Sequence, residues 1–378
     1  MSRRPLAVVV EGMYAFGGTE RHAVDIACGM TARGYEVTLL SRWPLDRHHA
    51  LLPELANHGV RVAPRGWTGE GTSHLDRPHV VAGRLFSLGS STALARHAWR
   101  WERVQIGRLA PGALVHEVPV RGYVAQAAQR THDQLRLPVV QTVLGTGPAP
   151  VSIIAPWAVV TSDCSPRLLP PDPPVMWIPT MGPDDKPRPP RQMPTDGRWR
   201  VAFAGRLVDT KGVRHLIRAW AGLSANAELI IMGDGDEAAP LANLSAALGV
   251  NATFTGRLDR AQFLHELESA HILAVPSLDA PYGEGVPTVI AEAMWAGLPV
   301  VASAVGGVER LFRNRKPGWL VPAGNEEALR DALTKAMSAA YPTAADAAPA
   351  VYREVLCPGA VLDRYEEAYE RARCAVTH

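Results

Sequence analysis

Short, uninterrupted apolar runs recur along the whole chain and are separated by amphipathic stretches. The runs are continuous rather than alternating, which is typical of parallel strands that helices cover on both faces. We predict strands at residues 6–10, 37–40, 114–115, 139–143, 158–161 and 175–178 in the first half, and at 201–204, 229–232, 252–255, 272–276 and 300–302 in the second. Each half is therefore expected to form its own α/β domain around a doubly wound parallel sheet.

The length of the chain supports the same division. A chain of 378 residues is too long for one typical hydrophobic core and predicts two domains. Residues 170–194 are crowded with prolines, a composition typical of a linker in which little can pack. We place a Rossmann-like domain at 1–182, the linker at 183–198, a second Rossmann-like domain at 199–356, and a closing amphipathic helix at 357–378 that packs back on the first domain. Ligands of such sheets bind at the carboxyl ends of the strands, so two facing domains predict a binding cleft.

Composition excludes several classes of function. The net charge of +2 gives no reason to expect a nucleic-acid partner. The four cysteines (Cys28, Cys164, Cys357 and Cys374) show no CxxC spacing, which argues against a zinc site or a disulfide framework. There is no signal-peptide pattern and no long apolar span, so we expect a cytoplasmic protein, and membrane association is the less favoured alternative.

Two carboxylates stand eight residues apart around a predicted helix start. Glu284 lies in the loop after the run at 272–276, and Glu292 lies inside a helix expected at 288–296, with Pro287 suited to its first turn. The backbone N–H groups of Thr288 and Val289 would stay unbonded there and attract an anion. Two acids around such a helix end suggest a phosphorylated, sugar-like ligand rather than a metal ion.

Two cations follow the first strand of the second half. Arg206 leaves the strand end and Lys211 comes five residues later, where the next helix begins. Both could clamp a diphosphate through charge-assisted hydrogen bonds. A surface ion pair is the alternative. The chain has only four lysines, so a lysine at this point favours the functional interpretation.

Three further motifs carry weaker signals. Gly17 and Gly18 precede the first helix and would allow a bulky anion to approach the backbone, although a helix start needing flexible residues explains them equally well. His116, after an apolar pair, is a candidate cleft histidine at a strand end, although a lone histidine is more often structural. The sequence Asp-Gly-Asp at 234–236 sits in a glycine-rich turn before a helix, where turn and capping duties are the better explanation than metal binding.

Taken together, these motifs resemble a known family. In order, the chain carries Gly-Gly-Thr-Glu at 17–20, Gly-Arg at 205–206, Lys-Gly at 211–212, Gly-Asp-Gly at 233–235, Phe-Thr-Gly at 254–256, Pro-Ser at 276–277, the segment 284–294, Gly-Leu-Pro-Val-Val-Ala at 297–302, Gly-Gly at 306–307 and Gly-Trp-Leu-Val at 318–321. This pattern resembles the family 4 retaining glycosyltransferases of GT-B fold, which belong to the glycosyl transferases group 1. The resemblance is dense from 201 to 321 and thinner from 51 to 134.

The resemblance implies that the second domain binds a nucleotide-diphosphate-sugar donor and the first domain a hydroxyl acceptor. It implies diphosphate contacts from Arg206 and Lys211, ribose contacts from Glu292, and a place for Glu284 near the transferred sugar. It also implies backbone contacts from residues of both domains, namely Gly17, Gly18, Leu258, Thr288 and Val289. No metal ion or other cofactor is required, and the configuration of the sugar is retained. The acceptor would be a small natural product or a glycan intermediate.

Two departures from the family pattern bear on the donor sugar. Where the family has a histidine near the C6 hydroxyl, after a Pro-Val-Val strand, this chain has Leu144. Leucine forms no hydrogen bond, so we hypothesise a pentose or 6-deoxy sugar, or replacement of the lost contact by His116. Pro287 stands where glycine is common and removes a backbone donor from the sugar site.

Two alternatives to a transferase stay open from the sequence. A nucleotide-sugar epimerase of the same fold would turn over its donor without any acceptor. A catalytically silent nucleotide-sugar-binding partner protein would bind the donor and transfer nothing. The presence of Arg206, Lys211, Glu284 and Glu292 argues against the silent protein.

Overall fold

The chain folds into two compact α/β units. The computed structural model describes residues 4–10, 13, 18–42, 44–65, 67–68, 101, 103–109, 112–118, 134–143, 159–161, 175–223, 226–279 and 285–376. One unit comprises Met1–Ile178 together with Leu362–His378, and the other comprises Pro179–Val361. The chain therefore passes between the units after Ile178 and again after Val361, whereas the sequence placed the first boundary near Pro183.

The first unit is built on a seven-stranded sheet in which every pair of neighbouring strands is parallel. The strand order is β4-β2-β1-β6-β7-β8-β9. The strands are β1 (Arg4–Val10), β2 (Tyr35–Ser41), β4 (Arg61–Pro64), β6 (Leu114–Val118), β7 (Val139–Val143), β8 (Val159–Thr161) and β9 (Val175–Trp177), and a separate pair joins β3 (Leu45–Asp46) to β5 (Trp67–Thr68). The helices of this unit include α1 (Gly18–Ala32), α2 (Leu52–Asn57) and most of α13 (Pro358–Val376).

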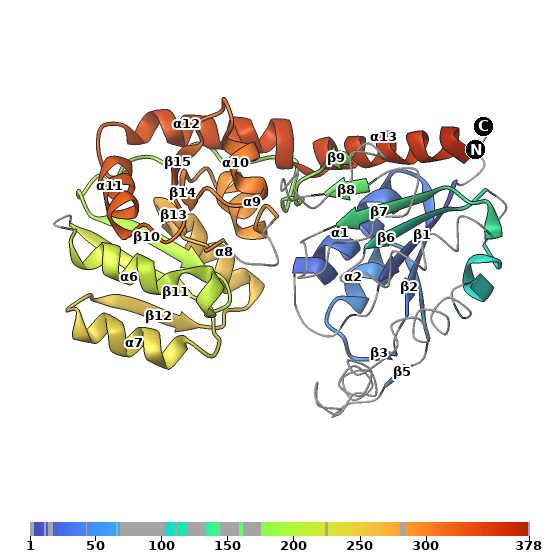
Figure 1. Ribbon diagram of the computed structural model, residues 1–378, viewed down its shortest axis with the longest axis horizontal. Coiled ribbons are helices and arrows are strands. Elements are labelled where there is room, and N and C mark those ends of the chain that lie inside the picture. Colours follow the sequence, from blue (N-terminus) through green and yellow to red (C-terminus); the bar gives the residue numbers. More distant parts are fainter. Residues whose placement is uncertain are drawn as a thin grey trace. The chain divides into compact units, whose positions relative to one another are not determined.

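Helix α13, the last element of the chain, packs against α1 and the first sheet (Figure 1). Its buried face consists of Leu362, Tyr365, Ala368 and Tyr369, which follow the helical period. A Cβ atom on Gly29 of α1 would lie 2.6 Å from Leu362 Cδ1, so this glycine lets the two helices approach closely. Arg33 adds an ion pair to Glu366 at 2.6 Å.

The second unit contains a six-stranded, all-parallel sheet of order β12-β11-β10-β13-β14-β15. The strands are β10 (Trp199–Ala204), β11 (Ala227–Met232), β12 (Ala252–Gly256), β13 (Ile272–Val275), β14 (Val300–Ser303) and β15 (Gly318–Val321). The helical segments are η1 (Asp209–Lys211), α6 (Val213–Ala221), α7 (Ala238–Ala247), α8 (Arg260–Ser269), α9 (Thr288–Trp295), α10 (Gly307–Phe312), α11 (Glu326–Ala336), α12 (Tyr341–Val351) and η2 (Tyr352–Leu356). Side chains of α6, α7, α11 and α12 pack on one face of this sheet and form its main core with strand residues such as Phe203 and Ile231.

The predicted fold class is confirmed, because each apolar run forms a parallel strand. Of the strands in the two large sheets, the sequence missed β4 and β15. Both are edge strands, and their residues are mostly half-buried or exposed, so neither forms the continuous buried run that marks an inner strand.

The proline-rich stretch differs from its expectation, because it packs onto the second unit. The N–H of Arg188 donates to the carbonyl of Trp295 at 2.6 Å, and the N–H of Arg191 donates to that of Gly297 at 2.9 Å. Gly297, at φ +78°, lies so close to Pro189 that a Cβ would meet its carbonyl oxygen at 2.1 Å. The residues between the prolines keep their backbone N–H groups. These groups can donate hydrogen bonds to the carbonyls at the end of α9, so the segment does not act as a loose spacer.

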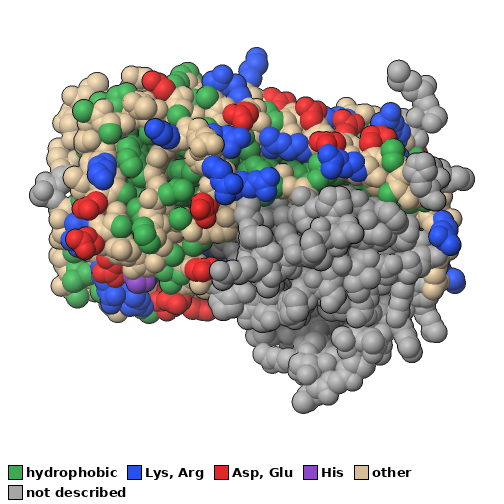
Figure 2. All heavy atoms as spheres, turned by 45° about the horizontal axis from the view of Figure 1, so that its top comes forward, with side chains coloured by type: hydrophobic (Ala, Val, Ile, Leu, Met, Phe, Trp, Pro, Cys, Tyr) green, Lys and Arg blue, Asp and Glu red, His purple; other side chains and the backbone are tan. Residues whose placement is uncertain are grey.

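The surface carries charges of both signs. Figure 2 shows acidic and basic side chains interspersed over the described surface of one face, in keeping with the net charge of +2. Among the described residues, no helix combines the length and the apolar character needed to cross a membrane.

Two buried histidines join α13 to the rest of the first unit and should make that unit sensitive to acid. Burial lowers the pKa of His22 to about 4 and that of His116 to about 3, from 6.5. Below pH 6.5 the unfolded chain therefore binds more protons than the folded one. The stabilising contribution is complete above pH 6.5 and is lost as the pH falls toward 4, by up to about 1.4 kcal/mol per pH unit for each histidine.

His116→Gln should flatten the dependence of the unfolding free energy on pH between 6.5 and 4.5, because one of the histidines with a lowered pKa is removed. Urea denaturation at a series of pH values measures this slope. The matched control is His265→Gln on the exposed surface of α8, which should keep the wild-type slope. An unchanged slope in His116→Gln would contradict the expectation.

Candidate functional site

The carboxyl edge of the second sheet contains a topological switch point. From β10 the chain proceeds to β11 and β12 on one side, and then crosses to β13 on the other side. The chain therefore leaves the neighbouring strands β10 and β13 toward opposite sides of the sheet. Open α/β sheets bind their ligands at such a point. Arg206 and Lys211 lie in the first of these loops, and the start of α9 follows the second.

Glycines bring the loop after β11 against the loop after β10. A Cβ on Gly233 would lie 1.9 Å from the carbonyl oxygen of Gly205, and one on Gly235 would lie 2.4 Å from that of Leu207. The N–H of Leu207 in turn donates to the carbonyl of Asp234 at 2.9 Å. This backbone support fixes the position of Arg206. Its side chain is exposed and makes no hydrogen bond or ion pair with any described residue.

The β10 loop is tied equally closely to the β13 loop. The N–H of Leu278 donates to the carbonyl of Thr210 at 2.9 Å. Gly212, at φ +67°, stands where a Cβ would lie 1.9 Å from the carbonyl oxygen of Pro276. Lys211 directly precedes this glycine and is half-buried. The close backbone contact between Gly212 and Pro276 therefore fixes the position of the Lys211 backbone.

Helix α9 begins at Thr288 without a side-chain cap, and Pro287 precedes it at φ −55° and ψ 135°. The first N–H to bond back is that of Ile290, to the carbonyl of Pro287 at 3.0 Å. The N–H groups of Thr288 and Val289 have no acceptor within the helix and point out of its start, where the helix dipole favours an anion. The remainder of α9 is largely buried and holds this end rigidly.

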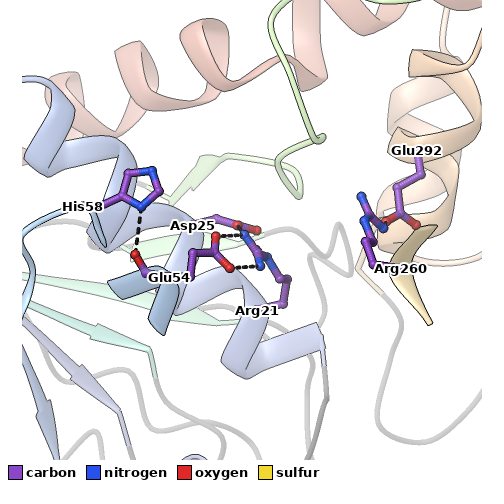
Figure 3. Close-up of polar contacts among 6 residues, drawn as sticks. All are labelled: Arg21, Asp25, Glu54, His58, Arg260 and Glu292. Atoms are coloured by element: carbon purple, nitrogen blue, oxygen red, sulfur yellow. Dashed lines mark hydrogen bonds and ion pairs between the residues drawn. The ribbon is translucent and has the colours of Figure 1, made fainter. Parts of the chain in front are cut away.

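Glu292, on the second turn of α9, forms an ion pair with Arg260 (Figure 3). Arg260 is the first residue of α8, two positions after Leu258. Arg260 was not among the residues that the sequence singled out. A cation at a helix start opposes the helix dipole by about 0.3–1 kcal/mol, and this local conflict was the signal that could have singled it out.

Asp234 serves the turn, as the sequence indicated. Its Oδ1 accepts a hydrogen bond from the N–H of Gly235 at 2.8 Å. Within the part of the chain that the structure describes, no three histidine, cysteine, aspartate or glutamate side chains gather in a way that could hold a metal ion.

The sequence also assigned residues at the start of α1, in the first unit, to the expected site. Gly18 is the first residue of α1, whereas Gly17, Glu284 and Leu144 lie outside the described residues. Arg21, one turn into α1, bonds Glu54 of α2 at 2.6 Å and Asp25 at 2.7 Å (Figure 3). These bonds fix the first turns of α1 against α2, and the sequence did not reveal them.

The expectation that His116 lies at a strand end is wrong. It is the third residue of the five-residue strand β6 and is fully buried. Its Nδ1 lies 2.8 Å from the hydroxyl of Tyr369, and its Nε2 lies 2.7 Å from that of Thr142. With both ring nitrogens engaged in the core, His116 has no atom to offer a substrate, so the structural interpretation is the correct one.

A buried ion pair stands near the carboxyl edge of the first sheet. Arg42, which directly follows β2, lies 2.8 Å from Glu117 of β6, and the two side chains are 1% and 0% exposed. Removing one member of such a pair leaves an uncompensated buried charge, at a cost of about 3–5 kcal/mol. This pair therefore fixes the edge of the first sheet. Its members are 75 residues apart in the sequence.

Residues 186–353 match a family model described as glycosyl transferases group 1. The chain is also similar to the phosphatidyl-myo-inositol mannosyltransferase of Mycobacterium leprae, with 36% identity over 137 residues, which make up 35% of this chain and 36% of that protein. The chain thus spans about a third of the length of the curated relatives that it matches.

Solved structures resemble the chain over nearly its full length. Sucrose-phosphate synthase from Thermosynechococcus elongatus has a TM-score of 0.73 at 19% identity, covering 99% of this chain and 100% of the other. HepE from Anabaena, in complex with UDP-glucose, has a TM-score of 0.67 at 17% identity, covering 97% and 99%. At these identities the likeness concerns the fold alone, and the fold is that of the GT-B glycosyltransferases.

The close contact at Gly212 can be tested with alanine substitutions at two glycines of similar conformation. Gly212 has φ +67° and Gly249 has φ +66°, but nothing lies within 4 Å of a Cβ at Gly249. Both substitutions carry the left-handed strain of about 1–2 kcal/mol. Gly212→Ala should lose about 1–3 kcal/mol more, because its Cβ overlaps the carbonyl of Pro276. Urea denaturation measures both, and equal losses would show that the β10 and β13 loops separate without cost.

Proposed function

Since residues 186–353 form a domain of the group 1 glycosyl transferases, we propose that the protein transfers a sugar from a nucleotide-diphosphate donor to a hydroxyl acceptor. The observation that carries this proposal is the arrangement at the switch point of the second sheet. There, two cations of the β10 loop and the open start of α9 follow neighbouring strands. That combination suits a diphosphate better than an uncharged ligand.

The donor is held by groups with separate tasks. Arg206 and Lys211 bind the diphosphate, and the N–H groups of Thr288 and Val289 approach the phosphate or the sugar. Glu292 accepts hydrogen bonds from the ribose hydroxyls, while backbone at Leu258 faces the base. Glu284 lies near the transferred sugar, and Gly17 and Gly18 approach the diphosphate from the first unit. HepE, which shares the fold, is known in complex with UDP-glucose, and this supports a nucleotide sugar as the ligand class.

The chemistry follows from where charge develops. Breaking the bond between the sugar and the phosphate places negative charge on the leaving diphosphate. Fixed positive groups and a helix start stabilise that charge more strongly in the transition state than in the ground state. The reaction then needs no divalent metal. The acceptor hydroxyl attacks the face of the sugar that the diphosphate leaves, and the departing phosphate oxygen takes its proton, so the configuration is retained.

The acceptor and the sugar are proposed from the sequence. The acceptor is a small natural product or a glycan intermediate, bound mainly by the first unit. Leu144 removes a hydrogen-bonding group from the sugar site, which favours a pentose or a 6-deoxy sugar over a sugar with a C6 hydroxyl. Pro287 removes a backbone donor, which also restricts the choice of donor.

Arg206→Ala should reduce kcat/KM by about 10²-fold to 10³-fold, the range seen when one group that stabilises transition-state charge is removed. The matched control is Arg218→Ala on α6, an exposed arginine at 44% whose partner is Glu326. This control should keep wild-type activity. Release of nucleoside diphosphate from UDP- and GDP-sugars, with a hydroxyl acceptor panel and excess EDTA, measures both rates.

The same assay separates the competing functions. Turnover that requires an acceptor and survives EDTA supports the proposal. Conversion of the donor sugar without an acceptor would indicate an epimerase, and undiminished turnover in Arg206→Ala would contradict the role of this site.

The choice of donor tests the hypothesis that Leu144 indicates a sugar without a C6 hydroxyl. With one nucleotide held constant, we expect a higher kcat/KM for UDP-xylose than for UDP-glucose, because Leu144 packs against a sugar that lacks the C6 hydroxyl. Leu144→His should shift the ratio toward UDP-glucose by about twofold to tenfold, since one hydrogen bond contributes about 0.5–1.5 kcal/mol. A wild-type preference for the hexose would remove the hypothesis.

A further inference from the structure

Arg260 occupies a position that its own helix disfavours. It is the first residue of α8, where the positive end of the helix dipole repels a cation. The helix start already has a complete capping box, in which Asp259 and Gln262 bond each other's backbone N–H groups. Local helix stability therefore gives no reason for an arginine here.

The ion pair with Glu292 does not supply that reason either. The Arg260 side chain is 54% exposed, and pairs at such exposure add little to stability because water and salt screen them. The small gain roughly offsets the unfavourable dipole term. A residue that breaks a local rule without a net gain in stability is a candidate for a functional role.

The geometry around Glu292 shows what that role is. Nη1 of Arg260 donates to Oε1 of Glu292, and the guanidinium lies 5.5 Å from the ring centroid of Phe263. The carboxylate is 16% exposed and lies on a well-buried helix. Oε2 makes no hydrogen bond to any residue that the structure describes. One oxygen is thus fixed by Arg260, and the other is available to a ligand.

We propose that Arg260 is the positioning residue of Glu292, and that it sets the carboxylate so that Oε2 receives the 2′-hydroxyl of a ribose. This inference rests on the proposed function, because it assumes that Glu292 meets the nucleoside of the donor. An unpaired glutamate rotates freely about its last bond, whereas a carboxylate held at Oε1 presents Oε2 in one direction.

Binding of UDP and GDP, each compared with its 2′-deoxy form by isothermal titration calorimetry, tests this inference. For the nucleotide that binds the wild type, we expect the ribonucleotide to bind about tenfold or more tightly than the 2′-deoxy form, as one hydrogen bond to a charged group allows. Arg260→Gln should abolish most of this preference by weakening the ribonucleotide alone, while Arg260→Lys should keep part of it. Glu292→Gln should weaken the ribonucleotide similarly, and the double variant should add little.

Arg218→Gln is the matched control, since this exposed arginine also pairs with a glutamate, Glu326, but from α6. It should keep the wild-type preference. The melting temperatures of the unliganded variants should stay close to that of the wild type, which excludes a folding defect. A preference that survives in Arg260→Gln but disappears in Glu292→Gln would overturn the positioning role and leave the proposed function intact. A wild type that binds neither nucleotide in either form would overturn the proposed function itself.

Discussion

The close approach of backbone at the carboxyl edge of the second sheet is the constraint on which the candidate site depends. At Gly212 and Gly233, any side chain would overlap a carbonyl oxygen of the neighbouring loop. The loops after β10, β11 and β13 are therefore in direct contact, and the cation-bearing segment rests on the segments beside it. A side chain such as Arg206 can then remain exposed and still start from a fixed position. Rigid placement of charge before the ligand arrives is what electrostatic stabilisation of a transition state requires.

The N-terminal unit adds buried polar contacts to its apolar core. Its fixed points are polar contacts buried between elements that are remote in the sequence, such as Arg42 with Glu117 and His116 with Tyr369. Inside a low-dielectric core, each such group must have its partner, because an unpaired polar group there is costly. These contacts fix the sheet and helix of the first unit beside its apolar core, and apolar packing with tight turns does the same in the second unit.

The sequence predicted the inner strands well, since a parallel strand buried on both faces must be continuously apolar. It predicted the candidate site where residues close in sequence share one edge, as Arg206 and Lys211 do. It missed Arg260, because the contact with Glu292 joins residues 32 positions apart on two helices, and the local signal, a cation at a helix start, does not reveal that partner. It misplaced His116 for the same reason, since the tyrosine that binds this ring lies 253 residues further along the chain. The proline-rich stretch was expected to be a linker because its composition indicates a stiff segment. Composition does not show that this segment forms hydrogen bonds with the end of α9.

The passage of α13 from one unit to the other has a consequence for how the protein is made. Leu362–His378 belong to the compact unit that begins at the N-terminus, and Tyr365 and Tyr369 complete its interior. During synthesis, Pro179–Val361 emerge and can condense as an independent body while the earlier-made unit still lacks its final helix. The half of the chain that leaves the ribosome first is thus the half that finishes folding last, and until then its apolar sheet surface is exposed to chaperones and to other nascent chains.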